Sequence, residues 1–422
     1  MSAASWPTFS VQVAFNSTTP GAFILDTSQL NTGFLGGLNW QNILTDVRGW
    51  TINGGRQTSL DRFQASQLVL QLDNTSGNYD PDNTAGAYFG TVNPGVPIRI
   101  TAIYNGTGWP LFYGYVDEWL PQYTPGSHSY QSVQVTATDA MDILSNFVST
   151  PQTPQGAGET TDARINRVLD NMGWDASLRN LDVGLVTLQD TDLSQAAFDD
   201  IQTAVDSELG LWYISRDGLV RFERRTARLT SPRSTTAQWT WSDRGTWGTD
   251  PVYETVIRRH RNDLVRNLIQ GQCVGGTLIQ REDLVSQAQT QGPRSLNNTS
   301  LLLEDDAAVA SWCDLLLYYY KDPLSRIESV TFDPLGDPSV LWPICLGAQI
   351  SDRATVVVHP PVGSTVTKAC FVEGVSHSYS TGDGATASWS TTFPVSPADK
   401  WTESWFILDD PSFGVLDSSV LL

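Results

Sequence analysis

Oxygen-bearing side chains crowd into one short stretch of this 422-residue sequence, residues 72–83, which reads LDNTSGNYDPDN. A calcium loop of the EF-hand type needs oxygen ligands at positions 1, 3 and 5, a glycine at position 6 and a carboxylate at position 12. Counted from Asp73, position 5 is Gly77, which offers no side-chain ligand; counted from Asp80, Ala85 stands at the glycine position. The stretch therefore fails as a calcium loop and predicts a strand end followed by turns.

Motifs for a catalytic nucleophile or a transition-metal site are also incomplete or absent from the sequence. Residues 374–378, GVSHS, resemble the G-x-S-x-G nucleophile elbow, but they lack its last glycine and lie in a strand-like run. The histidines show no HExxH pattern and the cysteines no CxxC, so core or surface histidines and buried free thiols are expected. The residues concerned are His128, His260, His359 and His377, and Cys273, Cys313, Cys345 and Cys370.

Acidic pairs and tryptophans raise the alternative of a carbohydrate site. A glycosidase needs two carboxylates at a fixed separation in space, which sequence spacing does not give. Asp199 and Asp200 are expected on the solvated side of a helix, and the alternation of Trp239 and Trp241 favours core or interface packing over sugar stacking. The other residues of these kinds are Asp117, Glu118, Asp409, Asp410 and Trp247. We predict no catalytic residue, no metal ligand and no cofactor, which suits a structural or assembly role.

The composition is that of an acidic globular protein. Forty-five acidic residues against 25 basic residues give a formal charge of −20. Such a chain repels a phosphate backbone, although it can form the wall of a passage that DNA crosses without sticking. The sequence begins without a basic region followed by an apolar core and has no run of 18 apolar residues, so we expect neither a signal peptide nor a membrane span, and folding in a cytoplasm.

The first 150 residues have the alternation of β-strands. Leu68, Leu70 and Leu72 share one face, and residues 96–104 (VPIRITAIY) alternate in the same way before Asn105-Gly106, a dipeptide typical of hairpin turns. Short strands punctuated by Gly, Pro and Asn predict a barrel or sandwich. The Pro- and Gly-rich residues 150–160 then predict a linker.

A small α+β unit is predicted after this linker. One helix carries Ile165, Val168, Leu169 and Met172 and ends at Gly173; a second begins at Ser194, carries Phe198, Ile201, Val205 and Leu209, and stops at Gly210. A hairpin with Asp217-Gly218 at its turn follows.

From about residue 236 the pattern returns to strands, with one strong helix. Glu304, Asp305 and Asp306 form its first turn, Val309, Trp312, Leu316 and Tyr320 its buried stripe, Lys321 its last turn, and Pro323 stops it. Residues 329–393 are predicted to be β throughout. The fold class is therefore mainly β with an α+β insert, in several domains.

Residues 47–83 and 92–119 resemble the first domain of tail-tip hub proteins of long-tailed bacteriophages. The match is closest to minor tail proteins of phages that infect actinobacteria. Residues 207–225 and 374–397 resemble later segments of these proteins, as does the closing WFILDDPSFGVLDS. The shared elements are Gly55-Arg56, Leu60-Asp61-Arg62, Leu72-Asp73-Asn74, Gly77, Tyr79-Asp80-Pro81, Pro94-Gly95, Pro97-Ile98-Arg99 and Phe112-Tyr113-Gly114-Tyr115-Val116.

The resemblance implies a structural protein of the virion tail tip: a homotrimeric baseplate hub that closes the tail tube, adapts its sixfold symmetry to threefold, and forms the channel for genome ejection. Implied partners are a distal tail ring protein, a tape measure protein, central fibre or spike proteins, and viral DNA passing through the lumen. A lytic or receptor-binding extension, which some hubs carry, is not expected in this chain. The alternatives are a hexameric distal tail ring protein and a cell-wall hydrolase or carbohydrate-binding protein at the tail tip.

The implied domains divide the chain into five parts. They are 1–150, a first tube-like β-barrel domain; 151–235, a small α+β domain of two helices and a hairpin; 236–335, a second tube-like β domain with one helix; 336–395, a C-terminal β domain; and 396–422, a C-terminal tail.

Overall fold

The computed structural model describes most of the chain, and every statement below concerns these parts: residues 6–15, 38–123, 131–149, 158–191, 193, 195–381 and 387–401. Several predicted features lie outside them: most of the linker at 150–160, the helix cap at Ser194, His128, and the acidic pair Asp409-Asp410.

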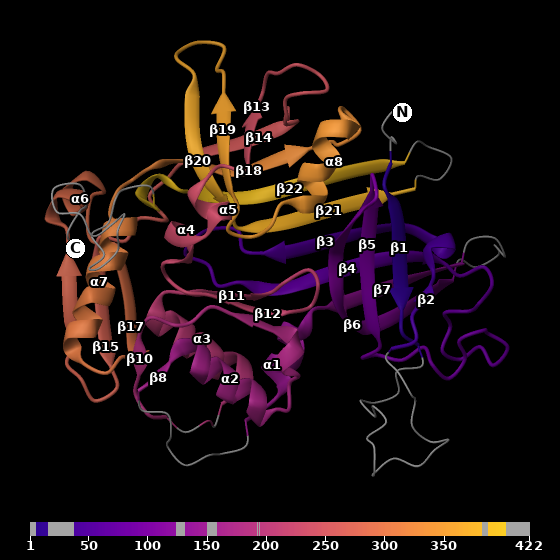
Figure 1. Ribbon diagram of the computed structural model, residues 1–422, viewed down its shortest axis with the longest axis horizontal. Coiled ribbons are helices and arrows are strands. Elements are labelled where there is room, and N and C mark those ends of the chain that lie inside the picture. The colour runs from indigo at the N-terminus through magenta and orange to yellow at the C-terminus, as the bar shows by residue number, and fades with distance from the viewer. Residues whose placement is uncertain are drawn as a thin grey trace.

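One large sheet organises the described chain. Its strands follow the order β13-β19-β20-β22-β21-β3-β4-β7-β6-β5-β1-β2, and β14 joins through β18, which pairs with β22. Figure 1 shows strands of the first third of the sequence at one end of this sheet and strands of the last third at the other. The bounds are β1 Thr8–Val13, β2 Gln41–Asn42, β3 Val47–Gly55, β4 Gln64–Asp73, β5 Pro97–Tyr104, β6 Thr107–Tyr123, β7 Gln131–Thr138, β13 Trp239–Ser242, β14 Thr255–His260, β18 Ser325–Phe332, β19 Arg353–Val358, β20 Val366–Val372, β21 Gly374–Ser380 and β22 Ser388–Pro397.

Strands β1 to β7 form the first β unit, and alternation decides which side chains enter its core. Leu68, Leu70 and Leu72 of β4 are fully buried, as the period of two predicts. The turn between β5 and β6 has Asn105 and Gly106 with φ of 49° and 81°, the left-handed geometry of a tight hairpin. The short helices η1 Leu44–Asp46 and α1 Ala140–Asn146 interrupt the strands, and the second of them lies where only β structure was predicted.

Strands β13, β14 and β18 to β22 form the second β unit. Trp241, Phe332 and Phe393 pack together at its core: Trp241 stacks on Phe393 and meets Phe332 edge to face, with ring centroids 5.3 Å apart in each pair. The pairing of β18 with β22 crosses the expected boundary at residues 335/336, so the segments 236–335 and 336–395 contribute to one sheet. The domain division itself stays a prediction.

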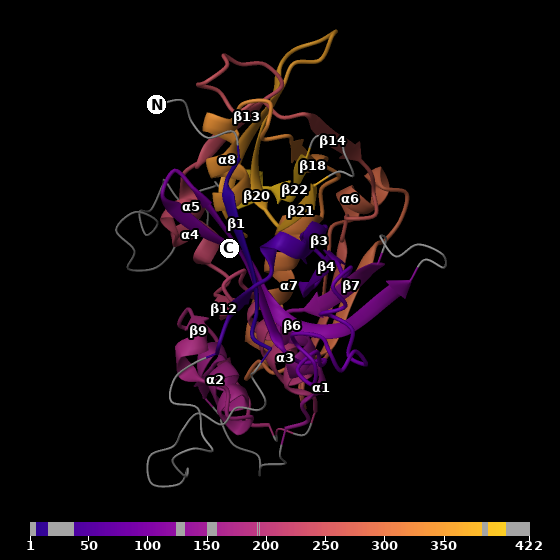
Figure 2. The same ribbon diagram turned by 90° about the vertical axis from the view of Figure 1, so that its right-hand side faces the viewer.

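The two β units meet along β3 and β21, which pair antiparallel over seven residues from Gly374↔Gly55 to Ser380↔Gly49. Figure 2 shows β21 directly above β3. Glycines allow this close approach: a Cβ on Gly374 would lie 2.6 Å from the carbonyl oxygen of Gly54, and Gly55 has φ of 98°. We call this pairing the β3–β21 seam.

The α+β unit lies against the first β unit and contains the two predicted helices and the predicted hairpin, together with short helices and strands that were not predicted. Its second helix begins at Ala197, with Ala196 before it, three residues later than predicted; it ends at Glu208, with Leu209 in the left-handed conformation. Gly218, at φ 89°, turns the predicted hairpin. The elements are β8 Glu159–Thr160, α2 Thr161–Asn171, η2 Ala176–Leu178, β9 Arg179–Leu181, β10 Thr187–Leu188, α3 Ala197–Glu208, β11 Leu211–Ile214, β12 Val220–Glu223, α4 Ala227–Thr230 and α5 Pro232–Thr235.

Between β14 and β18 the chain leaves the large sheet and builds a small sheet of its own, in the order β16-β15-β17. The predicted strong helix, α7, covers this sheet; it is capped by Asp305 and buries Val309, Trp312 and Leu316. Two helices were missed, because residues 284–289 and 338–347 were predicted as β. The bounds are β15 Leu268–Cys273, β16 Ile279–Glu282, α6 Leu284–Gln289, β17 Ser295–Leu301, α7 Asp306–Tyr320, α8 Pro338–Gly347 and η3 Asp399–Trp401.

The seam predicts a steric test. Gly374→Ala should lower the free energy of unfolding by about 1–3 kcal/mol, because the added Cβ meets the Gly54 carbonyl and neither strand can shift without breaking its ladder. Gly108→Ala in β6 is the matched control, since a Cβ there meets nothing within 4 Å. Urea unfolding measures both variants. Equal midpoints for the two would show that the seam tolerates a side chain.

Candidate functional site

Glu373 occupies the point where one strand changes partners. Before it, β20 pairs with β19; after it, β21 pairs with β3; and both pair with the same strand, β22. The backbone N–H of Glu373 donates to the Pro394 carbonyl, and its own carbonyl accepts from the Arg56 N–H at 3.0 Å. Its side chain is fully buried where the two β units meet.

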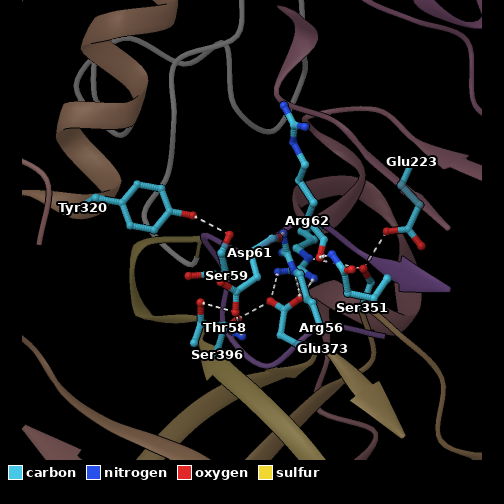
Figure 3. A network of polar contacts seen from close by, with 12 residues as sticks. Arg56, Thr58, Ser59, Asp61, Arg62, Glu223, Tyr320, Ser351, Glu373 and Ser396 are labelled. Atoms are coloured by element: carbon cyan, nitrogen blue, oxygen red, sulfur yellow. Dashed lines mark hydrogen bonds and ion pairs between the residues drawn. The ribbon is translucent and has the colours of Figure 1, made fainter. Parts of the chain in front are cut away.

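Two buried arginines neutralise this carboxylate. Arg56 Nε donates to Glu373 Oε2 at 2.7 Å. Arg228, from α4, binds both oxygens, with Nη1 to Oε1 at 2.7 Å and Nη2 to Oε2 at 2.9 Å. The Ser396 hydroxyl of β22 donates to Oε1 as well. Figure 3 shows Arg56 and Ser396 converging on Glu373. The cluster joins the first β unit, the α4 segment and the second β unit.

The electrostatics of this cluster depend on both arginines. Burial opposes ionisation of Glu373, but the charges and hydrogen bonds of Arg228 and Arg56 outweigh it and hold the pKa of Glu373 far below its ordinary value. Each guanidinium also lies over an aromatic ring: Arg56 is 4.6 Å from the centre of Phe63, and Arg228 is 4.7 Å from that of Phe371. A buried acid with two cations fixes a geometry; it offers no free group for catalysis.

The network extends from this cluster into the α+β unit. Arg228 Nε donates to the Ser351 hydroxyl at 3.2 Å, which donates to Glu223 Oε2 at 2.6 Å. Tyr213 OH donates to the other oxygen of Glu223 at 2.8 Å. Burial raises the pKa of Glu223 and the pKa of Tyr213. Figure 3 shows Ser351 between Glu223 and the Glu373 side of the network. We call Glu373, Arg56, Arg228, Ser396 and Ser351 the Glu373 cluster.

A cleft of about 1040 Å³ opens beside the Glu373 cluster, and we call it the central cleft. Its walls come from the β3–β4 connection, α3, the end of β12, β17, α7 and the start of β18. Polar contacts tie these walls together. Arg62 Nη2 pairs with Asp206 Oδ2 at 2.7 Å, and Tyr320 OH of α7 donates to the Ser59 carbonyl at 3.2 Å, as Figure 3 shows.

The oxygen-rich stretch 72–83 is the strand end and turn that the sequence predicts. Asp73 accepts from the Thr75 N–H at 2.8 Å, and Asn74 accepts from the Tyr79 N–H at 3.0 Å, so these side chains cap their own turns. Tyr79 is fully buried, and its OH donates to Asp46 at 2.6 Å. Within the described ranges, no group of three or more His, Cys, Asp or Glu side chains could hold a metal ion.

The histidines and cysteines examined as nucleophiles or ligands lie apart from one another. His377, on strand β21, is buried against Trp389 and contacts Thr391 Oγ1 through Nδ1 at 3.0 Å. Burial lowers its pKa to about 3. His359 contacts Asp243, and His260 is exposed on β14. The four cysteines are buried free thiols, as predicted.

One of the carbohydrate-site residues, Asp200, differs from the expectation. Asp200 is 8% exposed rather than solvated, and the Ser149 hydroxyl donates to its carboxylate at 3.2 Å; burial raises its pKa. Trp241 is in the core as predicted, whereas Trp247 is 75% exposed. Asp117 accepts from the Thr138 hydroxyl at 2.7 Å, an ordinary cross-strand contact.

No family model and no curated protein matches the sequence. Solved structures do match its fold. A tail protein of Neisseria meningitidis MC58 superposes with a TM-score of 0.58 at 12% identity, covering 94% of this chain and 98% of that one. The 43 kDa tail protein of prophage MuSo2 from Shewanella oneidensis gives a TM-score of 0.55 at 12% identity, with the same coverage of both chains.

The chain has a tail-protein fold. The mainly β class with an α+β insert is therefore confirmed, and the likeness spans nearly the whole of both tail proteins. The host lineage suggested by the resemblance finds no support in these two structures. Among the described helices, none has the length and apolarity needed to cross a membrane.

Sequence reasoning missed the Glu373 cluster altogether. Glu373 follows an apolar strand and precedes a glycine, which is a weak signal for a strand break that could have drawn attention to it. Arg56 lies 317 residues away in sequence and gives no pattern that links the two.

The cluster predicts a pH-dependent stability. Glu373→Gln should lower the free energy of unfolding at pH 7 by about 3 kcal/mol or more, because two buried arginines lose their counter-charge. The folded pKa of Glu373 lies below its unfolded value of about 4.5. Its contribution is therefore complete above that pH and is lost as the pH falls toward the folded pKa.

Urea unfolding of the wild type and of Glu373→Gln between pH 7 and pH 3 measures this contribution. The difference between their free energies of unfolding should narrow below about pH 4.5. Glu118→Gln, at an exposed site on β6, is the matched control. If this difference in free energy of unfolding stays constant down to pH 3, the charge of Glu373 is not what stabilises the contact between the two β units.

Proposed function

We propose that this protein is a structural component of a phage tail tip and assembles there as a trimeric baseplate hub. The observation that carries the proposal is the fold: one chain holds two β units joined edge to edge along the β3–β21 seam, and its likeness to two tail proteins extends over 94% of the chain. Three chains present six β units, the number needed to continue a sixfold tube while the chains themselves keep threefold symmetry.

The sheet edges support a closed assembly. Among the described strands, β2 pairs only with β1 and β14 only with β18, so each leaves one edge open. Open edges invite uncontrolled pairing unless they are short, charged or covered. Strand β2 has two residues, and β14 exposes Arg258, Arg259 and His260. A closed ring covers such edges with the neighbouring copy.

The charge supports a passage for DNA. Three copies at −20 each carry a formal charge of −60, and a negative lumen repels phosphates rather than trapping them. In this proposal the hub closes the tail tube before infection and forms the channel during genome ejection. Its partners are a distal tail ring protein, a tape measure protein and a central fibre or spike, and its buried network serves assembly rather than catalysis.

Native mass and copy number test the proposal. The purified full chain of 46.3 kDa should run as a species of about 139 kDa, three times that mass, in native mass spectrometry. Quantitative mass spectrometry of isolated tails should give three copies per virion, and antibody labelling should mark the tail tip.

A hexamer with six copies per tail would assign the protein to the distal ring instead. A stable monomer absent from tails would overturn the structural proposal. Incubation of the protein with host cell walls adds an independent check: released sugars or peptides would show an enzymatic role that the proposal does not contain.

A further inference from the structure

The lining of the central cleft has more basic than acidic side chains, unlike the chain as a whole. Eight of its lining side chains are arginine or lysine and five are aspartate or glutamate, whereas the whole chain carries −20. Five of these eight cations are neutralised locally: Arg56 and Arg228 pair with Glu373, Arg62 with Asp206, Arg164 with Glu159, and Lys400 with Asp322. The remaining three cations of the lining are arginines.

Three lining arginines have no carboxylate within ion-pair distance in the described part of the chain. Arg224 and Arg225 follow directly on β12 and are half-buried; Arg326 lies near the start of β18 and is half-buried as well. Burial lowers the pKa of Arg326. The Arg225 guanidinium acts on the buried Glu208 carboxylate, and that of Arg326 on Asp263, through charge alone and without a direct ion pair. Half-buried guanidinium groups without a paired carboxylate favour an anionic ligand, because an ion pair there would offset the loss of hydration.

The same cleft has apolar walls. Leu211 of β11, Leu296 of β17 and Leu315 of α7 line it and remain half-exposed, and Tyr319 lies with them. Apolar side chains beside unpaired arginines suit an acidic peptide with an apolar stretch better than an inorganic anion.

Residues 402–422, TESWFILDDPSFGVLDSSVLL, have this chemistry. The segment contains the apolar run 405–408 followed directly by Asp409 and Asp410, and it has no lysine, arginine or histidine. It also continues directly from η3, whose Lys400 lines the central cleft. A ligand tethered at the edge of its site binds as an intramolecular partner. Its effective concentration is then in the millimolar range, far above that of an ordinary free peptide.

We propose that the central cleft binds residues 402–422 of the same chain. Asp409 and Asp410 pair with Arg224 and Arg225, and the run 405–408 packs on the leucine wall. The segment thereby crosslinks the α+β unit to the β15–β17 sheet, two parts that the main sheet does not join. This inference does not depend on the oligomeric state of the protein.

Hydrogen exchange on the full-length protein tests the proposal. Amides of residues 405–412 should exchange more slowly than those of a free peptide of the same sequence. Reversing the cleft charges with Arg224→Glu and Arg225→Glu, or the segment charges with Asp409→Arg and Asp410→Arg, should raise these exchange rates by about tenfold. Combining all four substitutions should restore much of the protection.

The control is Arg244→Glu, which reverses the charge of an exposed arginine outside both the cleft and the open sheet edges. It should leave the segment's exchange unchanged. Wild-type rates equal to those of the free peptide would overturn the proposal, as would equal effects of the cleft and control variants. Should the cleft variant misfold, the segment variant alone decides, because it leaves every described residue intact.

A disulfide test identifies which copy supplies the segment. Chains carrying Arg225→Cys and Asp409→Cys are grown in ¹⁴N and ¹⁵N media, mixed after unfolding and refolding together, and oxidised. The proposal predicts that linked peptides carry one isotope throughout. Linked peptides of mixed isotope would assign the cleft to a neighbouring copy and overturn the same-chain occupant.

Discussion

One buried carboxylate holds this fold together. Glu373 accepts hydrogen bonds from Arg56 and Arg228 at the point where a strand leaves one β unit and enters the other. A buried ion of this kind is costly when a partner is missing and compatible with the core when every oxygen is satisfied. The arrangement therefore enforces a single geometry: if either arginine or the carboxylate moves, the remaining charges stay buried without compensation. The junction is specified by charge as well as by strand pairing.

The glycines of the β3–β21 seam belong to the same constraint. Gly55 and Gly374 let two backbones approach closely, and Arg56 and Glu373, the residues next to them, supply the ionic contact. At this end of the seam, positions that need no side chain thus stand next to positions that need a charged one. Such a pattern distinguishes the intended pairing of two sheets from any register that slips by one residue, because a slip would place charge against glycine and reverse the faces of both strands.

A structural feature could be predicted from the sequence only where the residues that determine it are close together in the chain. Helix α7 was predictable because Asp305 at the cap and the stripe through Trp312 follow rules that operate within a few turns. Helix α8 was not: it is buried nearly all round, so its apolar run lacks the period that separates helix from strand. The Glu373 cluster was beyond reach for a different reason, because its partners are brought together only by the finished topology. The burial of Asp200 could not be predicted for the same reason, because its partner Ser149 lies 51 residues away in the sequence.

The direction of the β3–β21 seam has a mechanical consequence. Its two strands run antiparallel in register over seven residue pairs, with the ladder bonds perpendicular to the strands. A pull directed along the strands loads all of these bonds at the same moment, whereas a pull across them breaks the bonds one after another. Tension applied along the seam is therefore shared by all of its hydrogen bonds, and the two β units respond to it as one rigid body.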